Sequence, residues 1–82
     1  MKKIVIYVKA GCIACEYTEK VIREICKNKQ IDIPVICDTS KNLSITVYPT
    51  VVFCDDTLEV ARISSTMPKD FYETVIDNFE KL

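Results

Sequence analysis

The sequence predicts an α/β domain in which helices cover a four-stranded mixed sheet. Two observations lead to this prediction. Apolar stretches with strand-like and helix-like spacing alternate along the chain, in the order strand, helix, strand, connection, strand, strand, helix. The first two strands flank a helical crossover and should be parallel, whereas the last two flank a tight turn and should be antiparallel. At 82 residues, the chain should form one domain over residues 1–82.

The first half of the chain contains three expected elements. Residues 3–8 are apolar on both faces, which is typical of a central buried strand. Residues 12–28 carry apolar side chains at helical spacing and charged side chains between them, so a helix is expected there. A second strand is expected over 31–37. Pro34 inside it cannot donate a ladder hydrogen bond, which places this strand at an edge of the sheet.

The second half begins with a polar stretch, followed by a short helical turn expected over 43–47. Strands are expected over 50–54 and 58–63, because the residues between them have turn composition. Ser65 and Thr66 are candidate N-caps for a last helix that begins near Pro68. This helix should bury a wide apolar stripe made of Phe71, Tyr72, Val75, Ile76 and Phe79.

Composition excludes several classes of partner. The net charge is −1 at pH 7 and no basic stripe is present, so we expect no nucleic-acid partner. No apolar run has the length of a membrane span, and Lys9 ends the N-terminal run before it could act as a signal sequence. We therefore expect a cytoplasmic monomer with no membrane partner.

The five cysteines are too irregularly spaced for a disulfide framework, and their number is odd. A close pair in a reducing cytosol is more typical of catalysis or of metal binding. Because the chain has no histidine, Cys–His catalysis and mixed Cys/His metal sites are excluded. The pair in question is Cys12 and Cys15.

Cys12 and Cys15 lie where the first helix is expected to begin. The unpaired N–H groups and partial positive charge of a helix N-terminus favour a thiolate and lower the pKa of a cysteine placed there. Cys12 should be the more exposed and attack a substrate disulfide; Cys15, one turn inside, should then resolve the mixed disulfide. Residues three apart on a helix are neighbours, so the two can form a redox-active disulfide. The main alternative is a metal-binding or metal-carrier module that uses the two thiolates.

Three segments resemble a known superfamily. Residues 7–15 resemble the active-site segment of glutaredoxins, including a lysine three residues before the first cysteine. Residues 47–53 resemble the cis-proline strand shared by thioredoxins and glutaredoxins, and residues 59–82 resemble the final strand and helix of thioredoxins. Together these segments cover nearly the whole chain, which is thus similar to small glutaredoxin-like or thioredoxin-like proteins.

The resemblance implies a thioredoxin fold with strand order 2-1-3-4, in which Pro49 is cis and lies against Cys12 and Cys15. It also implies a thiol–disulfide oxidoreductase, in the style of the small reductants that serve ribonucleotide reductase. The expected partners are disulfide-containing proteins and an electron-donating reductase or glutathione, and no cofactor or metal is expected. A metal carrier of the copper-chaperone type would end in a strand, whereas residues 71–82 have the pattern of a helix.

The same resemblance suggests which residues bind substrate. Lys9 is expected either to hold a thiolate or a substrate carboxylate or to be a surface lysine at a strand end. Tyr48 is expected either to cover the redox site or to be a partly buried aromatic residue of the loop. The main chain around Tyr48, Pro49 and Thr50 should pair with an extended substrate segment. Gly11, next to Cys12, is the last residue expected to bind substrate.

The sequence departs from the superfamily at several positions. Gly11 stands where thioredoxins have tryptophan, and Ile6 stands where they have a buried aspartate, so Cys15 lacks an obvious proton acceptor. The glycine-glycine-acidic signature that binds glutathione in glutaredoxins has no match near residues 64–66, which predicts that glutathione is a poor partner.

The three remaining cysteines are expected to lie outside the chemistry. Cys26 falls on the core face of the first helix, and Cys54 ends a strand that runs away from Pro49. Cys37 should lie on the same side of the sheet as Cys12, where it is either core packing or a regulatory thiol.

Overall fold

Strand β1 (Lys2–Tyr7) lies inside the sheet and is paired on both sides. In the computed structural model, which describes residues 1–82, the strand order is β2-β1-β3-β4. Strand β2 (Val35–Asp38) pairs with β1 in parallel, and β3 (Thr50–Asp55) pairs with it antiparallel. Strand β4 (Leu58–Ser64) forms a hairpin with β3. The expected sheet order and the central position of the first strand are confirmed.

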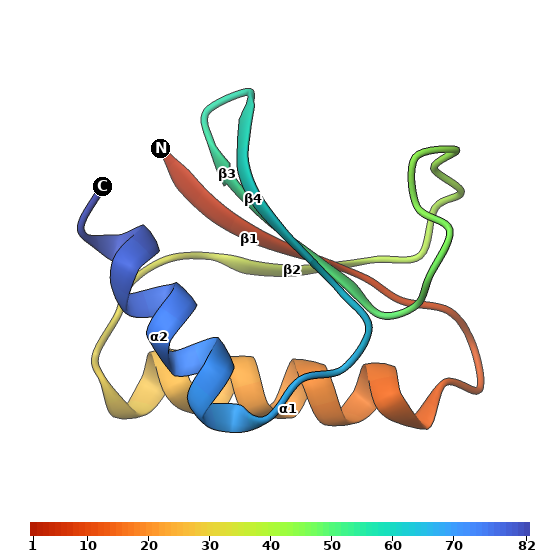
Figure 1. Cartoon of the computed structure of the whole chain (residues 1–82), viewed down its shortest axis with the longest axis horizontal. Coiled ribbons are helices and arrows are strands. Elements are labelled where there is room, and N and C mark those ends of the chain that lie inside the picture. Colours follow the sequence, from red (N-terminus) through yellow and green to blue (C-terminus); the bar gives the residue numbers. More distant parts are fainter.

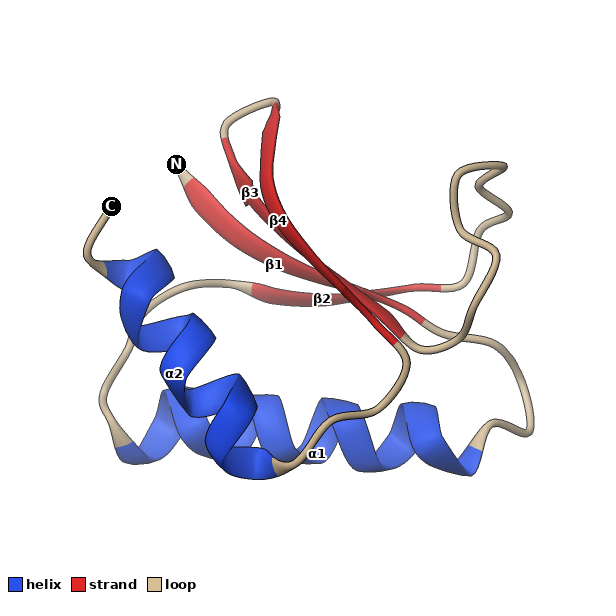
Figure 2. Ribbon diagram, viewed as in Figure 1, coloured by secondary structure: helices blue, strands red, loops and turns tan.

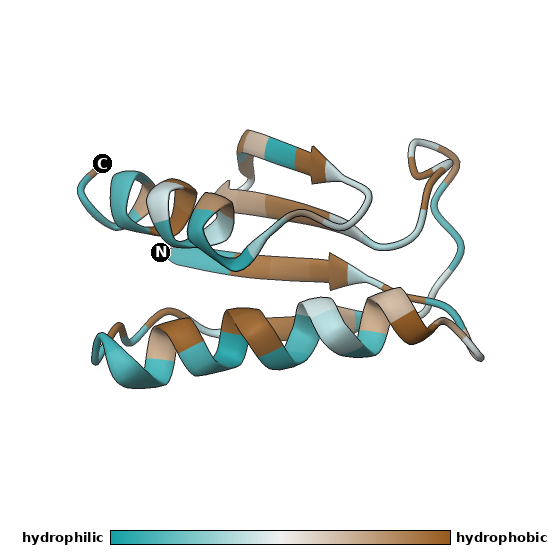
Figure 3. Ribbon diagram, turned by 60° about the horizontal axis from the view of Figure 1, so that its bottom comes forward, coloured by the Kyte–Doolittle hydropathy of each residue, from teal (hydrophilic) through white to brown (hydrophobic).

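Both helices lie on the same face of this sheet, as Figures 1 and 2 show. Helix α1 (Ile13–Asn28) connects β1 to β2, and helix α2 (Lys69–Glu80) follows β4. Apolar and polar residues alternate around α1, and the strands beside it are apolar (Figure 3). Six side chains of α1 are buried: Cys15, Thr18, Val21, Ile22, Ile25 and Cys26. The residues that recur at helical spacing in the sequence are therefore the ones whose side chains are buried in the fold.

The hydrophobic core lies between the sheet and the two helices. Alternate residues of the strands point into this core, including Ile4, Ile6 and Phe53, which are all fully buried. The rings of Phe53 and Phe79 meet edge to face, with their centroids 5.3 Å apart. Neither helix is long and apolar enough to cross a membrane.

Two expected elements differ from the structure. The second strand begins after Pro34, not at residue 31, because proline cannot donate to the ladder; its carbonyl still accepts the Ile4 N–H at 2.9 Å. The short helical turn expected over 43–47 is reduced to one hydrogen-bonded turn at residues 43 and 44. The Asn42 side chain accepts the Ser44 N–H at 3.0 Å, and the Asn42 carbonyl accepts the Ile45 N–H at 2.9 Å. No further bond continues this turn after Ile45.

The N-terminus of α2 differs from the prediction that Ser65 or Thr66 caps this helix. Pro68 is the N-cap and makes no side-chain capping bond, so Ser65 and Thr66 are not the caps. Both belong to the preceding loop, which is held by contacts with distant segments described below. The buried stripe of α2 consists of Tyr72, Ile76 and Phe79, whereas Phe71 is 41% exposed.

The sheet face opposite the helices carries a smaller buried patch. Val5 and Val52 stand opposite each other there and are nearly buried. The segment between β2 and β3 runs on this side of the sheet (Figure 1), and its Ile45 is buried as well. Arg62 of β4 donates to the Ser44 carbonyl at 2.9 Å while it pairs with Glu59. The segment that leads to Pro49 is thus tied to the hairpin.

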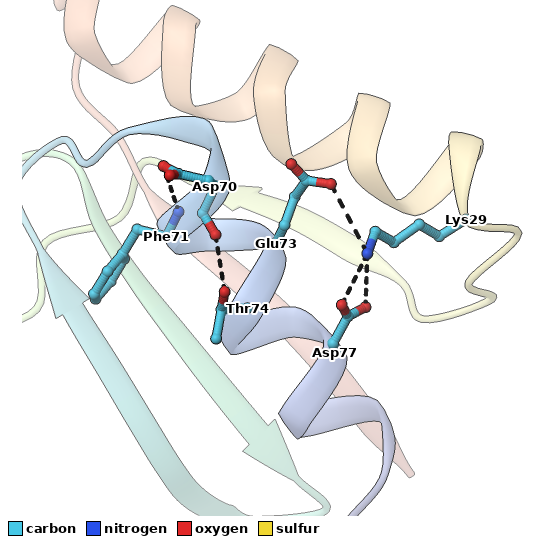
Figure 4. Close-up of polar contacts among 6 residues, drawn as sticks. All are labelled: Lys29, Asp70, Phe71, Glu73, Thr74 and Asp77. Atoms are coloured by element: carbon cyan, nitrogen blue, oxygen red, sulfur yellow. Dashed lines mark hydrogen bonds and ion pairs between the residues drawn. The ribbon is translucent and has the colours of Figure 1, made fainter.

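Ion pairs connect the residue after the C-terminal end of α1 to α2. The Lys29 ammonium lies 2.8 Å from Asp77 and 3.8 Å from Glu73 (Figure 4). Both carboxylates raise the pKa of Lys29, with the hydrogen bond that its ammonium donates to Asp77 as the main cause. These ion pairs are partly exposed, so solvent and salt weaken them.

Burial, and not these ion pairs, should dominate the stability of α2. Ile76→Ala removes a fully buried side chain and should lower the free energy of unfolding by about 2–5 kcal/mol. Lys29→Gln should have a clearly smaller effect, which shrinks further in high salt. Urea unfolding followed by circular dichroism measures both. Equal losses for the two variants would contradict this ranking.

Candidate active site

Cys12 and Cys15 form a disulfide at the N-terminus of α1, with their Cα atoms 5.2 Å apart. Cys12 is the N-cap of the helix, and its sulfur accepts the Cys15 N–H at 3.1 Å. A side-chain acceptor at this position satisfies one of the amide groups that the first turn leaves unpaired. The redox pair is therefore part of the structure that starts the helix.

The two sulfurs differ in their access to solvent. Cys12 is half-buried, whereas Cys15 is only 3% exposed. Gly11 precedes them with a φ of +72°, in the left-handed region that glycine adopts without strain. The expected asymmetry, with an accessible first cysteine and a buried second one, is confirmed.

The segment that precedes β3 lies at the same end of the sheet as this helix start (Figure 1). The cause is the strand register, in which Tyr7 at the end of β1 stands opposite Thr50 at the start of β3. The Tyr48–Pro49 peptide bond is cis. Lys9, after β1, places its ammonium 5.6 Å from the centroid of the Tyr48 ring. This cation–π contact links the two segments directly.

The predicted substrate-binding residues differ in availability. Lys9 and Gly11 are exposed and Tyr48 is half-buried, whereas Pro49 is fully buried. The Thr50 side chain is buried too, and its hydroxyl donates to the Val47 carbonyl. The structure thus brings Lys9 and Tyr48 together at the surface, leaves Gly11 exposed and places Pro49 and Thr50 beneath the surface.

The main chain at Tyr48 is free within the fold. Its N–H and C=O make no hydrogen bond to other residues of the chain, although the neighbouring Pro49 carbonyl accepts the Ser65 N–H at 2.9 Å. Unpaired main-chain groups beside an extended strand are able to pair with an added peptide segment.

The remaining cysteines lie in different surroundings. Cys37 stands opposite Ile6 and is partly buried against the core. Burial raises the pKa of its thiol, as does the Glu19 carboxylate, which forms a 2.9 Å ion pair with Arg23. Burial also raises the pKa of Cys26.

Cys54 and Ile6 lie on strands β3 and β1. Cys54 pairs with Lys3, at the end of β3 remote from Thr50, as expected. Ile6 is fully buried in the core, so an apolar side chain, and no acid, lies at this position of β1. No group of three or more His, Cys, Asp or Glu side chains is placed to hold a metal ion.

Sequence reasoning did not identify the loop between β4 and α2 as part of this region. Ser65 bonds to Pro49, and the Thr66 hydroxyl lies 3.4 Å from that of Thr18 in α1. Contacts over such chain distances leave no local sequence signal. The sequence offers residues 65 and 66 only as candidate caps and as a place where the glutathione signature is absent.

The raised pKa values of Cys26 and Cys37 predict a loss of stability in alkaline solution. Folding disfavours both thiolates, so the unfolded chain releases these protons first, from about pH 8 upward. The free energy of unfolding should therefore fall between about pH 7.5 and 9, by at most about 1.4 kcal/mol per pH unit for each thiol. Urea unfolding of the oxidised protein under argon measures this slope, and the Cys26→Ala/Cys37→Ala variant should flatten it. A wild-type stability that rises over this range would contradict the prediction.

The fold is similar to that of solved thioredoxins. No protein-family model and no curated protein sequence matches the chain. Among solved structures, thioredoxin-2, described as a component of malaria parasite protein secretion machinery, matches with a TM-score of 0.79 and 16% identity. That match covers 95% of this chain and 82% of the other.

Two further structures show the same similarity. Thioredoxin f2 of Chlamydomonas reinhardtii matches with a TM-score of 0.75 and 17% identity, over 94% of this chain and 77% of its own. A structure described as that of a malarial protein matches with a TM-score of 0.76 and 16% identity, over 96% and 97%. The chain therefore has the thioredoxin fold, with a CxxC disulfide at the start of its first helix.

Proposed function

We propose that this chain is a thiol–disulfide oxidoreductase that reduces protein disulfides through Cys12 and Cys15. The observation that carries the proposal is the position of the pair at the N-terminus of α1. The half-buried Cys12 sulfur caps the helix, and Cys15 lies buried one turn inside. The helix N-terminus favours negative charge on Cys12, and the Cys15 N–H that bonds this sulfur also stabilises a thiolate.

The reaction runs in two exchange steps. In the reduced protein, the Cys12 thiolate attacks one sulfur of the substrate disulfide, forms a mixed disulfide and releases the first substrate thiolate, which takes a proton from water. Cys15 then loses its proton to solvent and attacks the Cys12 sulfur. The mixed disulfide breaks, the second substrate thiol leaves, and two electrons have passed to the substrate. The protein ends with the Cys12–Cys15 disulfide, the state in the structure.

The surroundings of the pair favour an extended polypeptide as substrate. The unpaired main chain of Tyr48 is available for strand-like pairing with a peptide. The Lys9 ammonium and the Tyr48 ring border the same region and add a positive charge and an aromatic surface. A reductase that renews the dithiol is the electron donor we propose. We infer a cytoplasmic monomer that needs no cofactor, because the cysteines themselves carry the electrons.

The roles of the two cysteines can be separated by trapping. Cys15→Ser should accumulate a mixed disulfide between Cys12 and a protein substrate, because the resolving thiol is missing. Cys12→Ser should not, since Cys15 is only 3% exposed. Non-reducing electrophoresis and mass spectrometry detect the adduct. The Cys12→Ser/Cys15→Ser variant controls for Cys26, Cys37 and Cys54. Adducts formed by Cys12→Ser alone would reverse the assignment.

Glutathione should be a poor reductant of the oxidised protein. Residues 64–66 carry no glycine-glycine-acidic signature, and Lys9 offers only a single exposed charge. Lys9→Ala should therefore change the rate of reduction by glutathione less than about fivefold. The assay compares glutathione with an NADPH-dependent thioredoxin reductase, each supplied in turn with insulin as the final acceptor. Efficient turnover with glutathione would show that another surface binds it.

A further inference from the structure

The loop between β4 and α2 is bonded to three other parts of the molecule. The Ser65 N–H donates to the Pro49 carbonyl at 2.9 Å, and the Thr66 hydroxyl lies 3.4 Å from that of Thr18 in α1. The Met67 N–H donates to the Tyr72 hydroxyl in α2 at 3.1 Å. We call residues 65–67 the brace, because they connect the segment before β3 with the helix that carries the redox pair.

Tyr72 holds the brace from beneath. Its side chain is fully buried, and its hydroxyl accepts from Met67 while it donates to the Ser65 carbonyl at 3.4 Å. One phenol oxygen thus binds both ends of the three-residue brace. Ser65 has a φ of +72°, which is uncommon for a residue other than glycine and requires support from its surroundings. The bonds from Tyr72 and Pro49 supply that support.

Thr18 is the contact of the brace on the redox helix. It lies three residues after Cys15, on the same face of α1, and is fully buried. A helical threonine commonly bonds back to its own helix, as Thr74 does to the Asp70 carbonyl at 3.1 Å. The partner of Thr18 lies outside its helix, in the brace.

We propose that Tyr72 is a positioning residue that, through Ser65 and Thr66, sets the place of the Tyr48–Pro49 segment relative to Cys12 and Cys15. This inference rests on the proposed function and adds to it a determinant of polypeptide substrates. A peptide bound along Tyr48 must present its disulfide to the Cys12 sulfur, and small displacements of bound reactants lower exchange rates steeply. A small disulfide that diffuses directly to Cys12 does not depend on that alignment.

The test measures oxidation of the reduced protein in a single turnover, so that no electron donor is needed. Formation of the Cys12–Cys15 disulfide is followed by acid quench and mass spectrometry, with either insulin or bis(2-hydroxyethyl) disulfide as oxidant. Tyr72→Phe removes both hydrogen bonds of this hydroxyl and should lower the second-order rate constant with insulin by at least about threefold. The rate constant with the small disulfide should change less than about twofold.

Further variants keep the test decisive if Tyr72→Phe is poorly folded. Thr66→Val alters an exposed residue and should shift the insulin rate in the same direction. Thr66→Ser, which keeps the hydroxyl, should restore it. Thr74→Val, which removes a hydroxyl bonded only within α2, is the matched control and should leave both rates unchanged. In the Tyr72→Phe/Thr66→Val double variant the loss should be smaller than the product of the single losses, because both act through the brace.

Two results would overturn the inference. One is an equal loss with both oxidants, which indicates a general structural effect. The other is an insulin rate that remains at the wild-type value in folded Tyr72→Phe and Thr66→Val proteins. Failure of the proposed function looks different, because the wild-type protein itself would then react with neither oxidant.

Discussion

The pairing of β1 with both of its neighbours is the constraint on which the rest of the structure depends. Tyr7, at the end of this strand, stands opposite Asp38 on one side and Thr50 on the other. The chain passes from there directly into Cys12, so the register of β1 with β3 decides where Pro49 lies relative to the start of α1. The same register buries Ile4 and Ile6 beneath the helices. A slip of one residue would turn these side chains to the opposite face, and the core and the site would be lost together.

Cys12 both caps helix α1 and forms the disulfide with Cys15. Serine, threonine and aspartate are the common N-caps, and their oxygen atoms bond the first amide groups of a helix. In α1 a sulfur takes that place, so the group expected to exchange disulfides also starts the longer helix. Helix α2 lacks a side-chain cap altogether, and its stability depends on Tyr72, Ile76 and Phe79 in the core. The two helices are therefore stabilised at different points, α1 partly at its functional end and α2 along its buried face.

Features set by nearby residues were predictable from the sequence, and features set by distant ones were not. The buried strand over residues 3–8, the helix from Cys12 and the contrast between Cys12 and Cys15 all follow from local spacing, and the structure confirms them. The sheet order followed from a resemblance, since composition alone does not select one pairing. The residue type of Thr66 predicts a helix cap, but its hydroxyl bonds to Thr18, 48 residues away in the chain. The helical turn expected over 43–47 is cut short after Ile45, where the Ser44 carbonyl bonds to Arg62 on another strand.

The Cys12–Cys15 disulfide closes a short ring, and this limits its effect on the stability of the whole chain. A cross-link restricts the unfolded chain in proportion to the logarithm of the segment it encloses. These two cysteines are only three positions apart, so the bond removes less conformational entropy than a link between remote segments would. All elements after the first turn of α1 lie outside the ring and are held by burial, hydrogen bonds and a few partly exposed ion pairs. Opening and closing the bond should therefore change the folding free energy of the domain less than a long-range disulfide would, so the reduced and oxidised chains should have similar stability.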